Sequence, residues 1–432
     1  MIELEIMRGW LMLNIGKRLY IQRTINGVEL ESLAKDLISP LRLRRIENGY
    51  IVPSTTLLES IAARLDLPSV FFTNYEEMDM QLLYLLNQLF EDIILGSNKA
   101  KSLIELIDDN YYEYLLSPKL ECYFLLLKVS YLIKSGDLTT SDQIVSNFLD
   151  PYFKDINIDG LPLYLRKAYH YTNGLYNYYQ QDYDQCLVNY SILKNMVENL
   201  LEKAVITYNI GLIYQQLGKH QQTISIITEV IAYYDKLDLP YESALAYNLL
   251  GAAYRGTKSY KEAHSAFKSA QSYAEEFRYF DILGFIFHNT GMIFKDSGNI
   301  KKAIELFTKS IEMKEKDNHR NLSITYRELI ECHLLVKNID KAHHLHSIAE
   351  SLKINEDQHY RLLQAFNEYY RLNQNLDEYL SNLKQLIKYF LQVDDKYELR
   401  KCYTQIGKYY YRDRKYKLAS EYFLKNIELS EG

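Results

Sequence analysis

The chain contains few residues that interrupt regular structure: its 432 residues include only 7 prolines and 17 glycines. Because these two residues are the main breakers of helices, their scarcity predicts long helices with few interruptions. Hydrophobic residues make up 47% of the chain and charged residues 25%, the balance of an ordinary globular protein, which excludes a largely disordered or collagen-like chain. The composition therefore favours an all-α fold.

The sequence also lacks the features of a secreted or membrane protein. It has no run of about eighteen uncharged apolar residues, so we expect no transmembrane helix. Its first residues include Glu3 and Glu5, whereas a signal peptide begins with basic residues. The four cysteines have neither disulfide nor metal-site spacing: Cys122, Cys186, Cys332 and Cys402. We therefore expect a cytoplasmic protein with reduced, buried thiols and no membrane contact.

Motifs of catalysis are missing as well. We find no glycine-rich phosphate loop, no nucleophile elbow and no zinc-protease helix. His343, His344 and His346 follow Cys332 and His333 by one helix, but their spacing matches no standard metal site. The 41 tyrosines are interpreted as packing residues with their hydroxyl groups at the rim. We expect no enzyme, no cofactor and no bound metal.

The N-terminal segment, residues 1–72, is expected to form a compact bundle of short helices. Such helices cannot be stable alone and must share one small core. The turn and capping residues place them from Ile15 to Asn26-Gly27, from Glu29 to Leu37, from the N-cap Ser39 through Ile46, and from Pro53-Ser54 through Leu65. Residues 73–80 are a short acidic linker.

The third of these helices carries Arg42, Arg44 and Arg45 within four positions, in a chain whose formal charge is -6. A helix fits the major groove of DNA, and arginine binds both phosphate and guanine. For three arginines alone, a solvated helix face is the preferred interpretation, so the triplet by itself does not establish DNA binding.

The run from Ile15 to Leu67 resembles the Cro/repressor-type helix-turn-helix along its whole length. Its marks are Leu33-Ala34, the ending Ile46-Glu47-Asn48-Gly49, Pro53-Ser54, and Ile61-Ala62 with Leu65. The resemblance implies that residues 29–37 and 39–47 are the two helices of the motif and that the second is the recognition helix. It implies DNA contacts by Ser39, Leu41, Arg42, Arg44 and Arg45.

The same resemblance implies an internal salt bridge between Arg23 and Glu47. It places the usual start of the family at Met12, so that residues 1–11 are an upstream extension. The chain departs from the family at Leu30 and Pro40-Leu41, where glutamine is common. Leu41 can contact a thymine methyl group but cannot make the paired hydrogen bonds of an amide.

Residues 81–432 contain an internal repeat. The clearest copies are NIGLIYQQLGKHQQTI, NLLGAAYRGTKSYKEA and NTGMIFKDSGNIKKAI, each of which predicts helix, tight turn, helix. A small residue lets the two helices approach, and an aromatic residue three positions later (Tyr214, Tyr254 or Phe294) is expected to fill the neighbouring hole. Fainter copies give seven marker positions at intervals of 37 to 40 residues: Gly174, Gly211, Gly251, Gly291, Ile330, Asn367 and Gly407. Two more degenerate helix pairs are expected between Tyr84 and Phe148.

This pattern resembles tetratricopeptide repeats, which implies a right-handed superhelix whose concave face is lined by the first helix of each pair. Four asparagines shortly before the marker residues are expected on that face: Asn173, Asn209, Asn248 and Asn289. An amide side chain offers one donor and one acceptor, which match a peptide bond. Lining helices about 8 to 10 Å apart would hold an extended peptide of roughly six to ten residues.

Further lining positions carry Gln215, Arg255 and Lys295, four residues after the marker, and Arg327, three residues before it. These side chains could bind carboxylates of a peptide. Tyr208 and His288 share the register of Arg327, but ordinary packing is the preferred interpretation for both. The chain is generally rich in asparagine and lysine, so a packing role remains open for the asparagines and the basic residues too.

A Cro-like N-terminal domain (residues 1–72, here called the head) on such repeats (residues 81–432, here called the body) resembles the RRNPP family. These proteins are cytoplasmic receptors for secreted signalling peptides that govern quorum sensing and phage lysogeny. The resemblance implies a homodimer that binds palindromic operator DNA and changes its arrangement when a peptide binds residues 81–432. Two alternatives remain: a constitutive repressor whose repeats bind a partner protein, and a scaffold whose head no longer binds DNA.

Overall fold

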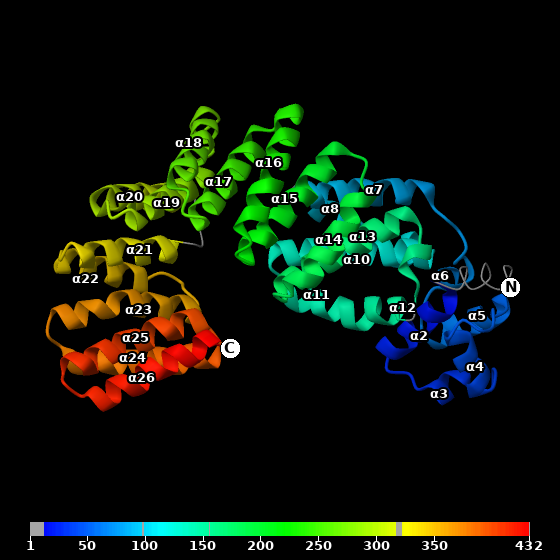
Figure 1. Ribbon diagram of the computed structural model, residues 1–432. Coiled ribbons are helices and arrows are strands. Elements are labelled where there is room, and N and C mark those ends of the chain that lie inside the picture. The colour runs from blue at the N-terminus through cyan, green and yellow to red at the C-terminus, as the bar shows by residue number, and fades with distance from the viewer. Residues whose placement is uncertain (1–12, 97–98, 155, 317–321, 432) are drawn as a thin grey trace. The chain divides into compact units, whose positions relative to one another are not determined.

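The computed structural model describes residues 13–96, 99–154, 156–316 and 322–431, and every regular element in these ranges is a helix (Figure 1). The all-α prediction is confirmed. Met12 and the expected upstream extension, residues 1–11, lie outside the described residues. The chain divides into two compact units, Met1–Tyr233 and Tyr234–Gly432. None of the described helices is both long enough and apolar enough to cross a bilayer.

The first unit begins with the expected bundle of short helices around a small core of its own, to which Leu19, Leu43 and Phe71 contribute. Its helices are α2 (Ile15–Ile25), α3 (Leu30–Ala34), α4 (Pro40–Glu47), α5 (Thr55–Arg64) and α6 (Ser69–Thr73). The N-caps of α4 and α5 are the expected serines: Ser39 Oγ accepts the Arg42 N–H at 3.3 Å and Ser54 Oγ accepts the Leu57 N–H at 3.4 Å.

One helix of the bundle is shorter than expected. The sequence predicts a helix to Leu37, but α3 ends at Ala34 because Lys35 turns into an extended conformation with ψ 131°. Asp36 then adopts the left-handed conformation with φ 59°. Aspartate tolerates this region better than most residues, so a turn replaces the last helical residues. The turn delivers the chain to the N-cap of α4.

Seven helix pairs follow, and the seven marker residues lie on the first helix of each pair. The prediction of seven repeats is confirmed. The pairs are α13 and α14 (Leu163–Tyr179, Tyr183–Met196), α15 and α16 (Leu200–Gln216, His220–Leu237), α17 and α18 (Pro240–Gly256, Tyr260–Glu276), α19 and α20 (Phe280–Asp296, Ile300–Lys316), α21 and α22 (Leu322–Leu335, Ile339–Glu350), α23 and α24 (Glu356–Leu372, Leu376–Gln392), and α25 and α26 (Lys396–Arg412, Tyr416–Glu431).

The expected earlier pairs are also present, in a less regular form. They comprise α7 (Met80–Leu95) with α8 (Ala100–Asp109), and α10 (Pro118–Ser135) with α11 (Leu138–Ile144). A short helix, α9 (Tyr111–Tyr114), joins the two pairs. A π-helix, η1 (Val145–Leu149), continues α11 and leads into α12 (Asp150–Phe153) and the 3₁₀ turn η2 (Ile158–Gly160).

All seven regular pairs share one turn geometry. The residue seven positions after each marker has a positive φ, between 58° and 83°: Gln181, Gly218, Lys258, Gly298, Lys337, Gln374 and Arg414. Only two of these residues are glycine, which is why the turn leaves a weak trace in the sequence. The common geometry shows that the faint copies are the same structural unit as the clear ones.

The hole beside each glycine marker is filled from the second helix. A Cβ atom on Gly251 would lie 2.6 Å from the ring of Phe267, and one on Gly291 would lie 2.8 Å from that of Phe307. The filling residue follows the marker by sixteen positions. The expected fillers, Tyr254 and Phe294, are only partly buried at the edges of the same cores, so the prediction of which aromatic side chain fills the hole was wrong.

Candidate functional site

Helix α4, the expected recognition helix, presents a free cationic face. Leu43, Ile46 and Glu47 point into the protein, whereas Arg42, Arg44 and Arg45 are exposed and Leu41 is 70% exposed. Among the described residues, none of the three guanidinium groups has an ion pair or a hydrogen bond. A surface with three unpaired arginines around an exposed leucine can contact phosphates and base edges without first breaking internal bonds.

The expected salt bridge between Arg23 and Glu47 is confirmed. Arg23 Nε donates to Glu47 Oε1 at 2.6 Å and Nη2 donates to Oε2 at 3.1 Å, while Nη1 donates to the carbonyl oxygen of Val28 at 2.9 Å. The hydrogen bond with Glu47 raises the pKa of Arg23. This paired contact joins the end of α4 to α2 in a defined orientation.

Two of the four asparagines meet on neighbouring first helices of the second unit. The side-chain amide of Asn289, on α19, donates to Asn248 Oδ1, on α17, at 3.0 Å. Each amide carries a donor group and an acceptor oxygen. The pair therefore keeps one NH₂ group and one carbonyl oxygen that bond to no other described residue, the complement of a peptide bond.

The other two asparagines belong to the first unit. Asn173 Nδ2 donates to the carbonyl oxygen of Tyr169, one turn earlier on its own helix, at 2.9 Å. Asn209 is partly buried on α15. Gln215, also on α15, contacts His220 Nδ1 through its Oε1 at 3.2 Å.

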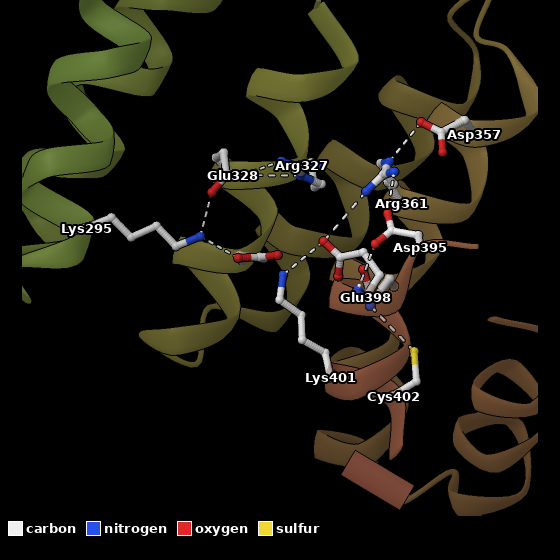
Figure 2. A network of polar contacts seen from close by, with 11 residues as sticks. Lys295, Arg327, Glu328, Asp357, Arg361, Asp395, Glu398, Lys401 and Cys402 are labelled. Carbon is white, nitrogen blue, oxygen red and sulfur yellow. Dashed lines mark hydrogen bonds and ion pairs between the residues drawn. The ribbon is translucent and has the colours of Figure 1, made fainter. Parts of the chain in front are cut away.

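The expected basic residues are already paired with carboxylates, as Figure 2 shows for Lys295 and Arg327. Lys295 and Arg255 reach carboxylates of the next repeat, whereas Arg327 pairs with Glu328 on its own helix. Lys295 Nζ donates to Glu328 Oε2 at 2.6 Å, and Arg327 Nη2 donates to Glu328 Oε1 at 2.8 Å. Glu331 also accepts from Lys295. Arg255 Nε donates to Asp296 Oδ2 at 2.7 Å. A peptide carboxylate would therefore have to displace an internal partner to bind these cations, and their role in peptide binding stays a prediction.

The same kind of network continues on α23 and α25, the first helices of the last two pairs (Figure 2). Arg361, on α23, donates to Asp357 and to Asp395, each at 2.8 Å. Its Nη1 lies 3.6 Å from Glu398 Oε1, and Lys401 donates to the same oxygen at 3.0 Å. Glu398 is only 7% exposed. Sequence reasoning missed these residues, because an ion pair between helices 34 positions apart leaves no local motif.

Glu328 is the centre of the first half of this network. Burial by itself would raise the pKa of its carboxyl group, but Lys295 and Arg327 outweigh burial and lower the pKa to about 2. For Lys295, burial acts to lower the pKa, and Glu331 together with Glu328 outweighs it and raises the pKa. Both groups stay charged at neutral pH, so the contact is a true ion pair.

The preferred packing role of His288 is confirmed. Its ring lies 5.5 Å from that of Phe307, and Nδ1 is 3.1 Å from Thr325 Oγ1. Burial, with the nearby Lys314, lowers the pKa of His288 to about 3. The histidines near Cys332 also pack rather than cluster, and His346 stacks on Phe366 at 3.8 Å. No three His, Cys, Asp or Glu side chains among the described residues are grouped as a metal site would require.

A hollow of about 470 Å³ lies between α23, α24 and α25. Its charged lining includes Arg371, four positions after the marker Asn367 and so in the register of Gln215, Arg255 and Lys295. That register was the signal for Arg371, which we did not predict. The full lining is Glu368, Arg371, Leu376, Tyr379, Gln405, Lys408, Tyr409, Arg412 and Asp413.

The pairing of Glu328 predicts a pH-dependent contribution to stability. Its carboxyl group titrates near pH 2 when folded and near its ordinary value of 4.5 when unfolded. The unfolded chain therefore binds more protons between these values, so the contribution is complete above about pH 5 and declines as the pH falls toward 2. We expect Glu328→Gln to lower the free energy of unfolding by about 3 kcal/mol at pH 7.

Urea unfolding at pH 7 and pH 3.5 checks this expectation. The gap between wild type and Glu328→Gln should shrink at the lower pH, whereas the exposed Glu305→Gln control should show a small gap at both. An equally large gap for Glu328→Gln at both pH values would contradict the ion-pair assignment.

Comparison with known proteins gives three kinds of match. Tetratricopeptide repeat models match residues 202–276 and 286–317. The chain is 26% identical over 420 residues to the transcriptional activator NprA of Geobacillus stearothermophilus, covering 91% of this chain and 99% of that protein. Because 91% of this chain is covered, the match cannot leave out all of residues 1–72 and therefore extends into the head.

Solved structures share the fold of the repeats. The apo form of the quorum sensor NprR from B. thuringiensis has a TM-score of 0.67 at 18% identity and covers 81% of this chain and 99% of its own. NprR in complex with its cognate peptide NprX has a TM-score of 0.61 at 16% identity and covers 82% of this chain and 100% of its own. Aspartyl phosphate phosphatase F from Bacillus subtilis, at 18% identity, has a TM-score of 0.57 and covers 82% and 96%. The tetratricopeptide fold is confirmed, but that fold alone does not select a function.

Proposed function

We propose that the chain, as an RRNPP-type regulator, is a cytoplasmic DNA-binding transcription regulator whose operator binding is controlled by a short peptide. Residues 1–72 bind DNA, and residues 81–432 bind the peptide and form the dimer. Residues 73–80 are the linker between these two domains. The similarity to a transcriptional activator over 91% of the chain supports the first part. The likeness of the repeats to a quorum sensor that was solved with its cognate peptide supports the second.

The DNA-binding proposal rests on the exposed face of α4. Ser39 begins the helix, Leu41 stands exposed near its start, and Arg42, Arg44 and Arg45 have no internal partner among the described residues. Arginine recognises guanine through two parallel hydrogen bonds and binds phosphate, so this face can both position the head and read bases. With leucine in place of glutamine at position 41, the arginines carry most of the base contacts.

The peptide-binding proposal rests on one observation, the Asn248–Asn289 pair. Its remaining donor and acceptor match the backbone of an extended peptide whatever the side chains of that peptide are. Asn173 and Asn209 are the corresponding residues of the first unit. We assign supporting roles to Gln215, Arg255, Lys295 and Arg327.

The ion pairs determine how such a peptide gains affinity. A carboxylate of the peptide that reaches Lys295 must compete with Glu328 and Glu331, which already hold that ammonium group. An exchange of one ion pair for another gains little free energy. The affinity therefore comes mainly from amide contacts and apolar side chains of the peptide, and it should depend only weakly on salt.

A dimer is supported by the last repeat, which leaves large apolar side chains uncovered. Tyr416, Leu424 and Ile427 on α26 are each more than half exposed. Exposed large apolar side chains on one helix are consistent with an interaction site. A homodimer also fits a palindromic operator, because two heads must reach half-sites about 34 to 36 Å apart or a multiple of that.

We expect a homodimer at micromolar concentration and a monomer for Leu424→Glu with Ile427→Glu. Two buried charges at an apolar interface are too costly to accommodate. Size-exclusion chromatography with light scattering measures the mass directly, and Leu335→Glu on α21, where the leucine is 62% exposed, is the matched control. A monomeric wild type would contradict this part of the proposal.

Replacing Arg42, Arg44 and Arg45 with alanine should abolish sequence-selective DNA binding. The probe is a duplex selected from a random library by the wild-type protein, and the measurement is fluorescence anisotropy. The control variant replaces Lys261, Lys268 and Lys301, which are exposed on the body, with alanine, and so removes the same charge. Equal loss in both variants would show that only net charge matters. If the wild type selects no sequence, the scaffold alternative is correct.

Asn289→Ala should weaken peptide binding at least tenfold, because it removes both a peptide contact and the partner of Asn248. The probes are synthetic peptides of five to ten residues from the C-terminus of any short secreted reading frame beside the gene. Isothermal titration measures the affinity, and the exposed Asn195→Ala serves as control. DNA binding without affinity for any of these peptides would favour the alternative of a repressor with a protein partner.

A further inference from the structure

A fully buried arginine joins the head to the first repeats. Arg18, on α2, is 0% exposed. Its Nε donates to Oε2 of Glu121, which lies on α10, at 2.8 Å. Its Nη1 donates to the carbonyl oxygen of Phe71 at 2.7 Å and also to that of Leu116, and Nη2 donates to the carbonyl oxygen of Leu115 at 2.8 Å. The guanidinium group therefore contacts both the head and the body.

Glu121, the partner of this arginine, is just as buried and collects two more donors. Tyr111 OH and Tyr152 OH each lie 2.5 Å from one of its carboxylate oxygens. Burial first, and then the charge of Glu121, raise the pKa of both tyrosines well above its usual range, so they remain neutral donors. The carboxylate thus has three donors from three different segments, α2, α9 and α12.

Apolar packing on either side makes α2 a shared helix. Leu19 belongs to the core of the head, whereas Ile21 belongs to the core that α7, α10 and α13 build in the body. Apolar contacts alone allow one surface to slide over another. Hydrogen bonds between charged groups are strong and directional, so the Arg18 cluster selects one orientation of α2.

From this geometry we infer that Glu121 is a positioning residue for DNA binding. It holds Arg18 and thereby α2, and α2 holds the recognition helix through Arg23 and Glu47. The head is then a rigid extension of the first repeats rather than a domain on a flexible linker. Any rearrangement of α10 or α12 moves α4 with it. Only the meaning of this movement for operator binding depends on the function proposed above.

The first test measures docking without DNA. In the linker, Glu76 and Glu77 are exposed and offer cleavage sites for a glutamate-specific protease. We expect the full-length Glu121→Gln protein to be cut there at least ten times faster than wild type, because an uncharged amide cannot hold the buried guanidinium group. Glu202→Gln is the matched control, since Glu202 is also buried and paired, with Lys167, but lies away from the head.

Milder variants cover the case in which Glu121→Gln does not fold. Tyr152→Phe and Tyr111→Phe keep the ring and remove one hydrogen bond to Glu121 each. Each should raise the cleavage rate at the linker at least threefold while circular dichroism of the repeats stays unchanged. Unchanged cleavage in both variants, or in a folded Glu121→Gln protein, would overturn the inference.

The second test separates positioning from mere stability. In the selected duplex, insertion of two or three base pairs between the half-sites should weaken binding by wild type at least tenfold. For Tyr152→Phe and folded Glu121→Gln the penalty should fall below threefold, because an undocked head can reach displaced half-sites. A penalty as large as in wild type would refute the positioning role. A wild type that binds no DNA would refute the proposed function, while the cleavage result would still decide the docking.

Discussion

The close approach of two helices within each pair is the constraint on which the rest of the protein depends. At Gly174, Gly251 and Gly291 there is no room for a Cβ atom, because a large side chain sixteen positions later lies against the backbone. A single pair cannot cover its own apolar surface, so each pair must stack on the next. Since one side of the first helix is used for the contact with the second helix, another side of the first helix remains for polar residues.

Those polar residues bond mainly to one another. Lys295, Arg327 and Arg361 bond to carboxylates on the same or the next first helix, and Asn289 bonds to Asn248. A ligand of this face therefore exchanges contacts rather than filling empty ones. Because the exchanged contacts join neighbouring helices, a ligand that changes them also changes how the pairs are held together, which is the physical basis proposed for linking peptide binding to DNA binding by residues 1–72.

Much of the architecture could be predicted because it has local causes. Caps such as Ser39 and Ser54, the spacing of the marker residues and the Cro-like run are all short-range patterns. The prediction failed where a distant partner decides the outcome. The pairing of Lys295 with Glu328 and the contact of Arg18 with Glu121, 103 positions later, have no signature in either local segment. The prediction of which side chain fills the space beside each glycine failed for a different reason. Large side chains lie both three and sixteen positions after the marker, and only the packing between helices selects one of them.

The central claim is that the first helices of the pairs bind a peptide and that this binding changes the affinity of residues 1–72 for DNA. The most direct measurement is the affinity of the full-length protein for its selected DNA, determined by fluorescence anisotropy with and without a saturating peptide that binds the repeats. The account predicts that the dissociation constant for DNA changes at least fivefold, and that DNA changes the affinity for the peptide by the same factor. Tight binding of both ligands with unchanged affinities would contradict it.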